Sequence, residues 1–344
     1  MQPADPFDAY VVERDGDEIA HGLRKLRLAD LPEGDVLVRV EWSGVNHKDA
    51  MVTEPGNRVA RVSPLVPGVD LAGVVEESTV AGIDPGTEVI AGGFDIGVSR
   101  HGGFAAYARL PADWVMPVPH HLTGRRAMIA GTAGLTAMMS VEALEAHGLE
   151  PGHGPVLVTA ASGGVGSFAV AALSSLGYEV VASTGKATER DWLMALGASE
   201  VIGREDLDTA PGRFLAPERF AGAIDPAGGR TLSLVLRSLR YGAAVAASGI
   251  VAGDSLEGTL YPFIIRGVSL IGIDSVLAPS KRREQAWARL ATAIDAATFE
   301  SLIAREVTLP ELPDAIADVL AGRVRGRVLV RVAPSAHGAS GTEH

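Results

Sequence analysis

The 344-residue sequence contains no cysteine. Disulfide bonds, a cysteine nucleophile and any zinc site with cysteine ligands are therefore excluded. A chain without cysteine is compatible with a reducing compartment, and we expect the protein to be cytoplasmic.

Other features are absent as well. The formal net charge of −12 shows no excess of positive charge, which argues against nucleic acid or an anionic membrane as the main partner. The first residues, MQPADPFDAY, have neither the basic nor the apolar region of a signal peptide. We find no apolar run as long as a membrane-spanning helix. The hydrophobic content of 47% is ordinary for a soluble α/β enzyme, and the length is enough for two domains.

The most informative segment is residues 155–186, which reads as strand, glycine-rich turn, helix and second strand. After an apolar, β-branched first strand, Ala160, Gly163 and Gly166 follow at intervals of three. A small residue permits a tight turn, and the glycines let the backbone approach a pyrophosphate and the helix pack on the strand. The helix at 165–176 would direct its N–H groups toward a phosphate. The pattern predicts a dinucleotide site; the alternative is a glycine-rich turn without a ligand.

The end of the second strand indicates which dinucleotide is bound. An NAD site normally places Asp or Glu there, to bind the ribose 2′-hydroxyl. Here the positions carry hydroxyl groups and a cation instead: Ser183, Thr184, Gly185 and Lys186. These groups suit a 2′-phosphate, and Arg204, after the next predicted strand, could reach the same place. We therefore expect NADPH. In the alternative interpretation Lys186 and Arg204 are solvated surface charges.

Residues 8–119 read as a β-rich unit. Val36, Val38 and Val40 alternate with other residues, Leu37 among them, in what we expect to be a half-buried strand. Further strands are expected at 69–76, 88–91 and 104–110, separated by Gly/Pro turns. Short strands of this kind suggest a small barrel or sandwich.

The pattern changes near residue 124. One helix is expected to begin after the N-cap Thr123, and a second to run from about 135 to 146. Strands and helices then alternate as far as a last strand at 268–273, which is typical of a parallel, doubly wound sheet. A long amphipathic helix at 280–297 and a few short elements follow. We expect one domain at 1–123, completed by 300–344, and another at 124–299.

Several segments resemble a known family. They are WSGVNHKDA (42–50), PGVDLAGVV (67–75), AMIAGTAGLTAM (127–138), TAASGGVGS (159–167), GYEVVASTGK (177–186), GAID (222–225), PFIIRGVSLIGIDSV (262–276) and RREQAW (282–287). The chain resembles the zinc-free medium-chain dehydrogenase/reductases, and most of all their acrylyl-CoA reductase and quinone oxidoreductase subfamily. The resemblance implies an α/β fold, in which a GroES-like β-rich domain accompanies a Rossmann doubly wound parallel sheet.

The resemblance also implies the cofactor-binding residues. Four would bind the pyrophosphate: Ser162, Gly163, Gly164 and Val165. Four would lie on the 2′-phosphate side: Thr184, Gly185, Lys186 and Arg204. Three would line the nicotinamide end: Ile250, Ile264 and Ser275. Gly322 falls where the family has a further cofactor-contacting residue, usually asparagine.

His47 is the main departure from the family pattern, because the family normally has tyrosine at this position. An imidazole can also donate a hydrogen bond, so cofactor contact through His47 is still expected. His47 is in addition a candidate catalytic donor or proton source, with a satisfied loop histidine as the alternative. Asp49 could orient His47, or it could cap a turn.

The reaction implied by the resemblance is reduction of the C=C bond of a small α,β-unsaturated acyl-CoA with NADPH. Four arginines are candidates for the phosphates of the CoA thioester: Arg58, Arg61, Arg323 and Arg325. No metal site is expected, because Val69 and Asp70 stand where zinc-dependent relatives have His and Glu. A homodimer is expected, since in this family the strand at 268–273 commonly pairs with its twin.

Two other functions stay open. One is a quinone or enone oxidoreductase with the same fold and cofactor. The other is a nucleotide-binding protein without turnover. An assay with NADPH and acrylyl-CoA, a quinone and a simple enone would separate the three.

Overall fold

The structure of the protein is a computed structural model, which describes residues 4–16, 18–210 and 212–332. Its contacts divide the chain into two compact units. Unit 1 contains the described residues up to Thr132 and from Ile303 onward, and unit 2 runs from Ala133 to Leu302. The expected domains, 1–123 with 300–344 and 124–299, have similar bounds, and their functional assignment stays a prediction.

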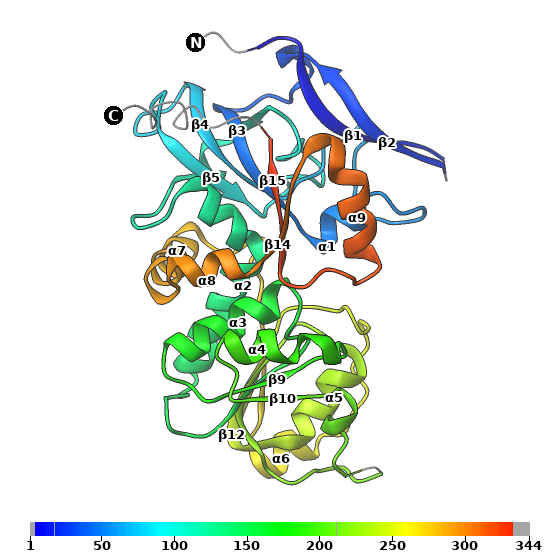
Figure 1. Ribbon diagram of the computed structural model, residues 1–344, viewed down its shortest axis with the longest axis vertical. Helices are drawn as coiled ribbons and strands as arrows, with labels where there is room; N and C mark the ends of the chain where they lie inside the picture. The colour runs from blue at the N-terminus through cyan, green and yellow to red at the C-terminus, as the bar shows by residue number, and fades with distance from the viewer. Residues whose placement is uncertain (1–3, 17, 211, 333–344) are drawn as a thin grey trace. The chain divides into compact units, whose positions relative to one another are not determined.

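Unit 1 is β-rich (Figure 1). Within its described residues the main sheet has seven strands, in the order β14-β15-β3-β4-β5-β7 with β6 paired to β3. These strands are β3 (Val36–Val45), β4 (Asp70–Ser78), β5 (Glu88–Gly92), β6 (Tyr107–Leu110), β7 (Val115–Pro117), β14 (Ile303–Thr308) and β15 (Arg327–Arg331). A separate antiparallel hairpin, β1 (Phe7–Asp15) with β2 (Glu18–Leu26), was not predicted. The short helix α1 (His47–Met51) packs on α9 (Leu312–Leu320).

Strand β3 is buried on one face and partly buried on the other. Val36, Val38 and Val40 belong to one apolar cluster of unit 1. Leu37, which is 0% exposed, belongs to a second cluster together with Leu312 of α9. The expectation of a half-buried strand therefore holds at Arg39 and Glu41, which are partly exposed, and fails at Leu37, where α9 and the first hairpin supply apolar neighbours. That packing partner lies far away in the sequence.

Unit 2 is built on a parallel sheet, which has six strands in the described part of the chain, in the order β10-β9-β8-β11-β12-β13. The strands are β8 (Val156–Val158), β9 (Val180–Ser183), β10 (Glu200–Ile202), β11 (Phe220–Asp225), β12 (Leu239–Ala247) and β13 (Ser269–Gly272). The chain moves outward from β8 to β10, then returns to β11 and moves outward in the other direction. The sheet is therefore doubly wound, as predicted, with its switch point between β8 and β11.

The helices of unit 2 follow the alternation predicted from the sequence, with one correction. They are α3 (Gly164–Ser175), α4 (Arg190–Ala195), α5 (Gly229–Ser238), α6 (Tyr261–Arg266), α7 (Ser280–Ala293) and α8 (Ala296–Ser301). The expected long helix at 280–297 is divided into α7 and α8. The carboxylate of Asp295 accepts a 2.8 Å hydrogen bond from the N–H of Thr298 and so begins a new helix.

The segment α2 (Gly124–Ala146) contains the two helices that were expected, and Arg126 N–H donates to the predicted N-cap, Thr123 Oγ1, at 3.2 Å. Gly131, at φ 51° and ψ −153°, is not helical, and it separates the two helices by a kink. By length and composition α2 could cross a membrane, so the expectation that no segment reaches that length needs correction. However, 83% of its most apolar window is buried inside the structure. A core helix has the same burial, so the length is weak evidence for a membrane span.

Candidate functional site

The glycine-rich turn of unit 2 has the geometry that its spacing predicts. Ala160 has a positive φ of 44°, and Gly163 N–H donates to Ala160 O at 2.9 Å, which closes the turn. A Cβ atom on Gly166 would overlap the backbone of Ala160 and Ala161, so only glycine lets α3 pack this closely on the end of β8. The tight turn and the close helix packing are therefore both present.

The N-terminus of α3 is the candidate pyrophosphate site. Gly163 is the N-cap of this helix, and Gly163, Gly164 and Val165 are partly exposed, whereas Ser162 is buried. The turn directly follows the carboxyl end of β8, which is where open parallel sheets bind phosphate groups. The described backbone therefore fits a dinucleotide, and the individual contacts with a pyrophosphate stay predictions.

Ser162 and Thr184 meet beside this turn, although they follow different strands, β8 and β9. Their hydroxyl oxygens are 2.9 Å apart, and Thr184 Oγ1 also accepts from Lys186 N–H at 3.1 Å. Ala161 N–H donates to Ser183 O at 3.0 Å, which ties the glycine-rich turn to the end of β9. The residues predicted for the pyrophosphate and for the ribose end therefore form one continuous surface.

Arg204 lies against Gly185, and its contact with a 2′-phosphate stays a prediction. Arg204 is the N-cap of the 3₁₀ turn η4 (Glu205–Leu207) after β10, and it is exposed. A Cβ atom on Gly185 would overlap Nε and Nη2 of Arg204, so the guanidinium occupies the space that the missing side chain leaves. The backbone at Gly185 does not need glycine for its φ angle. Glycine is needed there for the approach of the guanidinium.

Lys186 shares this place with Arg204. Burial lowers the pKa of Lys186, the carboxylate of Glu189 opposes this shift, and the nearby guanidinium of Arg204 adds to it. A guanidinium close enough to lower the pKa of a neighbouring ammonium group is an unfavourable arrangement, which an anion bound to both cations would relieve. This electrostatic pattern suits a phosphate better than a ribose hydroxyl.

The other predicted cofactor residues have more varied surroundings. Ile250 and Ile264 expose 65% and 72% of their surface, and the loop of Ile250 packs on Gly228 at the end of β11. Ser275 is buried and accepts from Thr136 Oγ1 at 2.7 Å. Gly322 lies in unit 1, where its φ of 65° follows the end of α9 and gives glycine a structural reason. Their roles stay predictions.

Asp225 is a residue of unit 2 that sequence reasoning missed as a site residue. It ends β11 at the switch point, is 0% exposed, and accepts from Thr159 Oγ1 at 2.5 Å and from Gly228 N–H at 2.7 Å. Burial raises the pKa of Asp225, and these two hydrogen bonds oppose the rise. Asp225 thus joins the carboxyl ends of β8 and β11. The only sequence signal was its position at the end of the segment GAID.

In unit 1 the structure places His47 and Asp49 on the same short helix but with different surroundings. His47 is the exposed first residue of α1. Asp49 is 0% exposed, and its Oδ1 accepts from Gly68 and Val69 N–H at 3.0 and 2.8 Å. Its Oδ2 accepts from Asn46 N–H at 2.8 Å, which caps the helix. These contacts describe the capping role, and the catalytic role of Asp49 stays untested.

A buried network under α1 was not predicted. Asp70 accepts from Asn46 Nδ2 at 2.7 Å and from the N–H and hydroxyl of Thr132 at 2.8 and 2.6 Å. Arg327, 3% exposed, donates to Asn46 Oδ1 at 3.1 Å and to Val45 O at 3.2 Å. Asn46 therefore stands between a buried cation and a buried anion, and it is the residue immediately before His47.

Burial dominates the electrostatics of this network. Burial raises the pKa of Asp49 to about 6, the nearby Asp70 carboxylate adds to the rise, and the backbone hydrogen bonds to Asp49 oppose it. Burial lowers the pKa of Arg327, while the carboxylates of Asp70 and Asp49 oppose that shift. One buried cation thus faces two carboxyl groups, and the raised pKa of Asp49 makes the stability of unit 1 sensitive to mildly acidic pH.

The donor groups near Asp70 do not fit a zinc site. A catalytic zinc needs three protein ligands. Asp70 directs both carboxylate oxygens to Asn46 and Thr132, the neighbouring residue is Val69, and the chain has no cysteine. Within the described residues no group of three His, Cys, Asp or Glu side chains is arranged to bind a metal.

Two of the four arginines proposed for a CoA thioester form ion pairs on the surface of unit 1. Arg61 lies 3.3 Å from Asp95, and Arg323 lies 2.7 Å from Asp318. Arg58 is exposed. Their contacts with a substrate stay predictions.

Comparison with known proteins defines the class. Residues 32–120 match the alcohol dehydrogenase GroES-like domain family, and residues 164–292 match the zinc-binding dehydrogenase family. The chain belongs to the medium-chain dehydrogenase/reductases, with a GroES-like domain and a Rossmann-type domain.

Within this class the chain is similar both to an acrylyl-CoA reductase and to a putative quinone oxidoreductase. It is 46% identical to acrylyl-CoA reductase AcuI of Ruegeria pomeroyi over 95% of this chain and 99% of the relative. It is 43% identical to the putative quinone oxidoreductase YhfP of Bacillus subtilis, with the same coverage. The crystal structure of Escherichia coli YhdH with bound NADPH superposes with a TM-score of 0.91, at 41% identity, and covers 94% of this chain and 100% of that one. The crystal structure of YhfP, with NAD bound, gives a TM-score of 0.93 at 43% identity and covers 96% and 100%.

The buried carboxyl group of Asp49 gives a prediction for stability against pH. Its pKa of about 6 in the folded chain lies above its ordinary value of 3.8, so the folded state binds this proton more tightly than the unfolded state. The resulting stabilisation is complete below about pH 4 and is lost as the pH rises through 6. In Asp49→Asn the amide cannot accept from Asn46 N–H, which should cost roughly 1–3 kcal/mol at low pH.

We therefore expect the stability gap between wild type and Asp49→Asn to narrow by on the order of 2 kcal/mol between pH 4.5 and 8. Urea unfolding of both proteins at each pH measures the gap. Asp95→Asn, which changes an exposed carboxylate, should leave stability within about 0.5 kcal/mol throughout. A gap that is constant or that widens with pH would show that Asp49 is not protonated in this range.

Proposed function

We propose that this protein reduces the C=C bond of a small α,β-unsaturated acyl-CoA with NADPH, as in the conversion of acrylyl-CoA to propionyl-CoA. The observation that carries the proposal is the likeness to acrylyl-CoA reductase AcuI, which extends over 95% of the chain at 46% identity. The cation pair at the end of β9 and β10 supports the choice of cofactor. In this proposal unit 2 binds NADPH and unit 1 carries the catalytic residues.

The cofactor assignment rests on this chain's own residues, because one similar structure contains NADPH and another contains NAD. An NAD-selective site needs a carboxylate for the ribose 2′-hydroxyl. The described chain instead brings Thr184, Lys186 and Arg204 together there. Two cations and a hydroxyl group favour a 2′-phosphate, since charge-assisted hydrogen bonds to phosphate are strong.

Bound NADPH supplies a hydride to the β-carbon of the unsaturated thioester. Negative charge then develops on the thioester carbonyl oxygen, and a donor directed at that oxygen typically contributes about 10²–10³ in rate. We propose His47 as this donor or as the proton source, because it is the exposed imidazole at the start of α1. The network of Asn46, Asp49 and Asp70 holds the start of α1 in place.

One specific observation favours a second candidate function. The putative quinone oxidoreductase YhfP is 43% identical to this chain, nearly as similar as AcuI. The same cofactor site would serve reduction of a quinone or an enone. A nucleotide-binding protein without turnover is the third candidate.

Steady-state NADPH oxidation with acrylyl-CoA, a quinone and a simple enone tests the proposal. We expect the highest kcat/KM with acrylyl-CoA and a lower kcat in His47→Phe with little change in NADPH affinity, because phenylalanine offers no donor. His47→Tyr, which restores a donor, should stay active. A higher kcat/KM with the quinone would favour the second candidate, and no turnover with any acceptor would favour the third.

The cofactor preference has a separate test. Lys186→Ala removes a charge-assisted contact and should weaken NADPH binding about tenfold, with less than a twofold effect on NADH. Gly185→Ala should also weaken NADPH several-fold, because the new Cβ displaces the flexible guanidinium of Arg204 while the backbone can stay in place. Gly258→Ala, with nothing within 4 Å of the added atom, is the matched control. Equal affinities of the wild type for both cofactors would refute the assignment.

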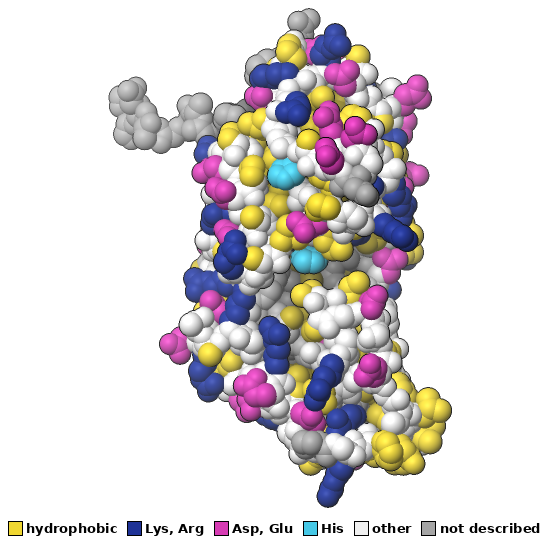
Figure 2. Space-filling model, turned by 90° about the vertical axis from the view of Figure 1, so that its right-hand side faces the viewer, with side chains coloured by type: hydrophobic (Ala, Val, Ile, Leu, Met, Phe, Trp, Pro, Cys, Tyr) yellow, Lys and Arg dark blue, Asp and Glu magenta, His cyan; other side chains and the backbone are white. Residues whose placement is uncertain are grey.

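We further propose a cytoplasmic, zinc-independent homodimer. Strand β13 is the edge of the unit 2 sheet, Leu270 on it is 38% exposed, and Ile264 and Ile265 of the neighbouring α6 are exposed too. Figure 2 shows hydrophobic side chains gathered on part of unit 2, whereas basic and acidic side chains are interspersed elsewhere on that face. Exposed apolar strand edges favour pairing with a second copy.

Light scattering should therefore give twice the chain mass of 35.6 kDa. Leu270→Lys should shift the protein toward monomer, because a charge at an edge strand opposes strand pairing. Metal analysis should find less than one zinc ion per chain. A monomer mass for the wild type at micromolar concentration would contradict the assembly, and stoichiometric zinc would contradict zinc independence.

A further inference from the structure

The position of Arg204 depends on a segment with little regular structure. Arg204 lies at the start of the connection between β10 and β11, residues 203–219, whose described part contains only the short turn η4. The arginine itself is exposed. Something other than secondary structure must therefore hold this connection while the guanidinium lies against Gly185.

The turn η4 is fixed at both of its ends. At its start, Asp206 Oδ2 accepts from Gly203 N–H at 2.8 Å, and Leu207 N–H donates to Arg204 O at 3.3 Å. At its end, Leu207 is 3% exposed and packs in the same apolar cluster as Val235 of α5. Asp208 N–H donates to Glu205 O at 3.1 Å, so Asp208 is part of the same turn. Movement of Asp208 would therefore move Arg204.

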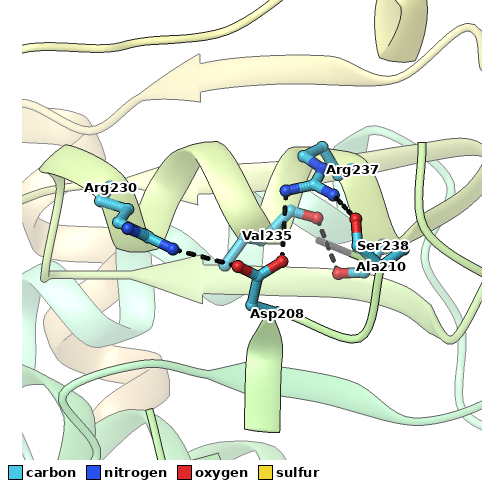
Figure 3. A network of polar contacts seen from close by, with 6 residues as sticks. All are labelled: Asp208, Ala210, Arg230, Val235, Arg237 and Ser238. Carbon is cyan, nitrogen blue, oxygen red and sulfur yellow. Dashed lines mark hydrogen bonds and ion pairs between the residues drawn. The ribbon is translucent and has the colours of Figure 1, made fainter. Parts of the chain in front are cut away.

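Asp208 is held by two arginines of α5 (Figure 3). Arg230 Nη2 donates to Asp208 Oδ2 at 3.0 Å, and Arg237 Nη1 donates to Asp208 Oδ1 at 3.5 Å. Arg237 also donates through Nη2 to the carbonyl oxygen of Ala210. The side chain of Arg230 is 81% exposed, whereas those of Asp208 and Arg237 are 21% and 19% exposed. The less solvated contact, with Arg237, should matter more, because solvent screens exposed ion pairs.

We propose that Asp208 is a positioning residue for cofactor selectivity, which fastens η4 to α5 so that Arg204 stays against Gly185 beside Lys186. The inference rests on the proposed function, since it assumes that Arg204 and Lys186 bind the 2′-phosphate of NADPH. Asp208 itself does not touch the cofactor in this account. Its carboxylate affects NADPH binding only by fixing the position of Arg204.

A contrary expectation follows from simple charge. A carboxylate near a phosphate site would repel the phosphate, so its removal would strengthen NADPH binding. A merely structural role of the carboxylate would weaken NADPH and NADH alike. The positioning role predicts a third result, a loss confined to the cofactor that carries the 2′-phosphate.

The test is to measure the dissociation constants of NADPH and NADH for the full-length protein carrying Asp208→Asn. We expect the NADPH constant to rise three- to tenfold and the NADH constant to change less than twofold. Arg230→Ala, which removes the exposed partner, should change either constant less than twofold. Glu200→Gln, which breaks an ion pair with Arg219 on the same unit, is the control for loss of a surface charge.

A double substitution shows whether Asp208 acts through Arg204. In an Arg204→Ala background, Asp208→Asn should change the NADPH constant less than twofold, because there is no guanidinium left to position. If the rise in the NADPH dissociation constant of the double variant equals the product of the rises in the two single variants, the inference is overturned. It is also overturned if Asp208→Asn binds NADPH more tightly than the wild type, or if it weakens NADPH and NADH binding equally. If Asp208→Asn does not fold, Arg237→Lys takes its place in these measurements. We expect the same loss of affinity for NADPH alone, and the same outcomes would overturn the inference.

These variants distinguish failure of the positioning role of Asp208 from failure of the proposed 2′-phosphate site. If Arg204→Ala and Lys186→Ala leave NADPH binding unchanged, the 2′-phosphate site is wrong and the inference falls with it. If those two variants lose NADPH selectively but Asp208→Asn and Arg237→Lys do not, the cofactor site stands and only the positioning role of Asp208 is refuted.

Discussion

The close approach of the Arg204 guanidinium to the backbone of Gly185 is the contact on which the account of unit 2 depends. It requires a residue without a side chain at the end of β9, and an arginine at the start of the connection after β10. Lys186 lies beside both; burial lowers its pKa, the Glu189 carboxylate opposes this shift, and the Arg204 guanidinium adds to it. Two adjacent strands thereby contribute one cationic surface at the carboxyl edge of the sheet, where doubly wound folds bind nucleotides.

In unit 1 a buried polar network holds the start of α1. Asn46 separates a buried arginine, Arg327, from a buried aspartate, Asp70, and accepts from one while donating to the other. The same residue is the N-cap of α1, and Asp49 returns a hydrogen bond to its backbone. Buried charges of this kind are costly unless they are paired, so the network confines α1 and its exposed His47 to one arrangement.

Local sequence was sufficient for much of the fold and for the glycine-rich turn of the candidate nucleotide site. The spacing of Ala160, Gly163 and Gly166 predicted the turn, and the missing carboxylate after Ser183 led to Lys186 and Arg204. Residues joined across long distances were not predictable in this way. Asp70 and Thr132 are 62 positions apart, and Arg327 and Asn46 are 281 apart. For the same reason the burial of Leu37 was missed, since its apolar cluster includes residues of α9, which come from the other end of the chain.

The central claim is that the described end of β9 and β10 recognises a 2′-phosphate. The most direct measurement compares two nucleotides that differ only in the 2′-phosphate, by calorimetric titration of the protein with 2′,5′-ADP and with 5′-AMP. Because a charge-assisted contact contributes roughly 1.5–3 kcal/mol, we expect 2′,5′-ADP to bind about tenfold or more tightly than 5′-AMP. Equal affinity for the two nucleotides would contradict the claim.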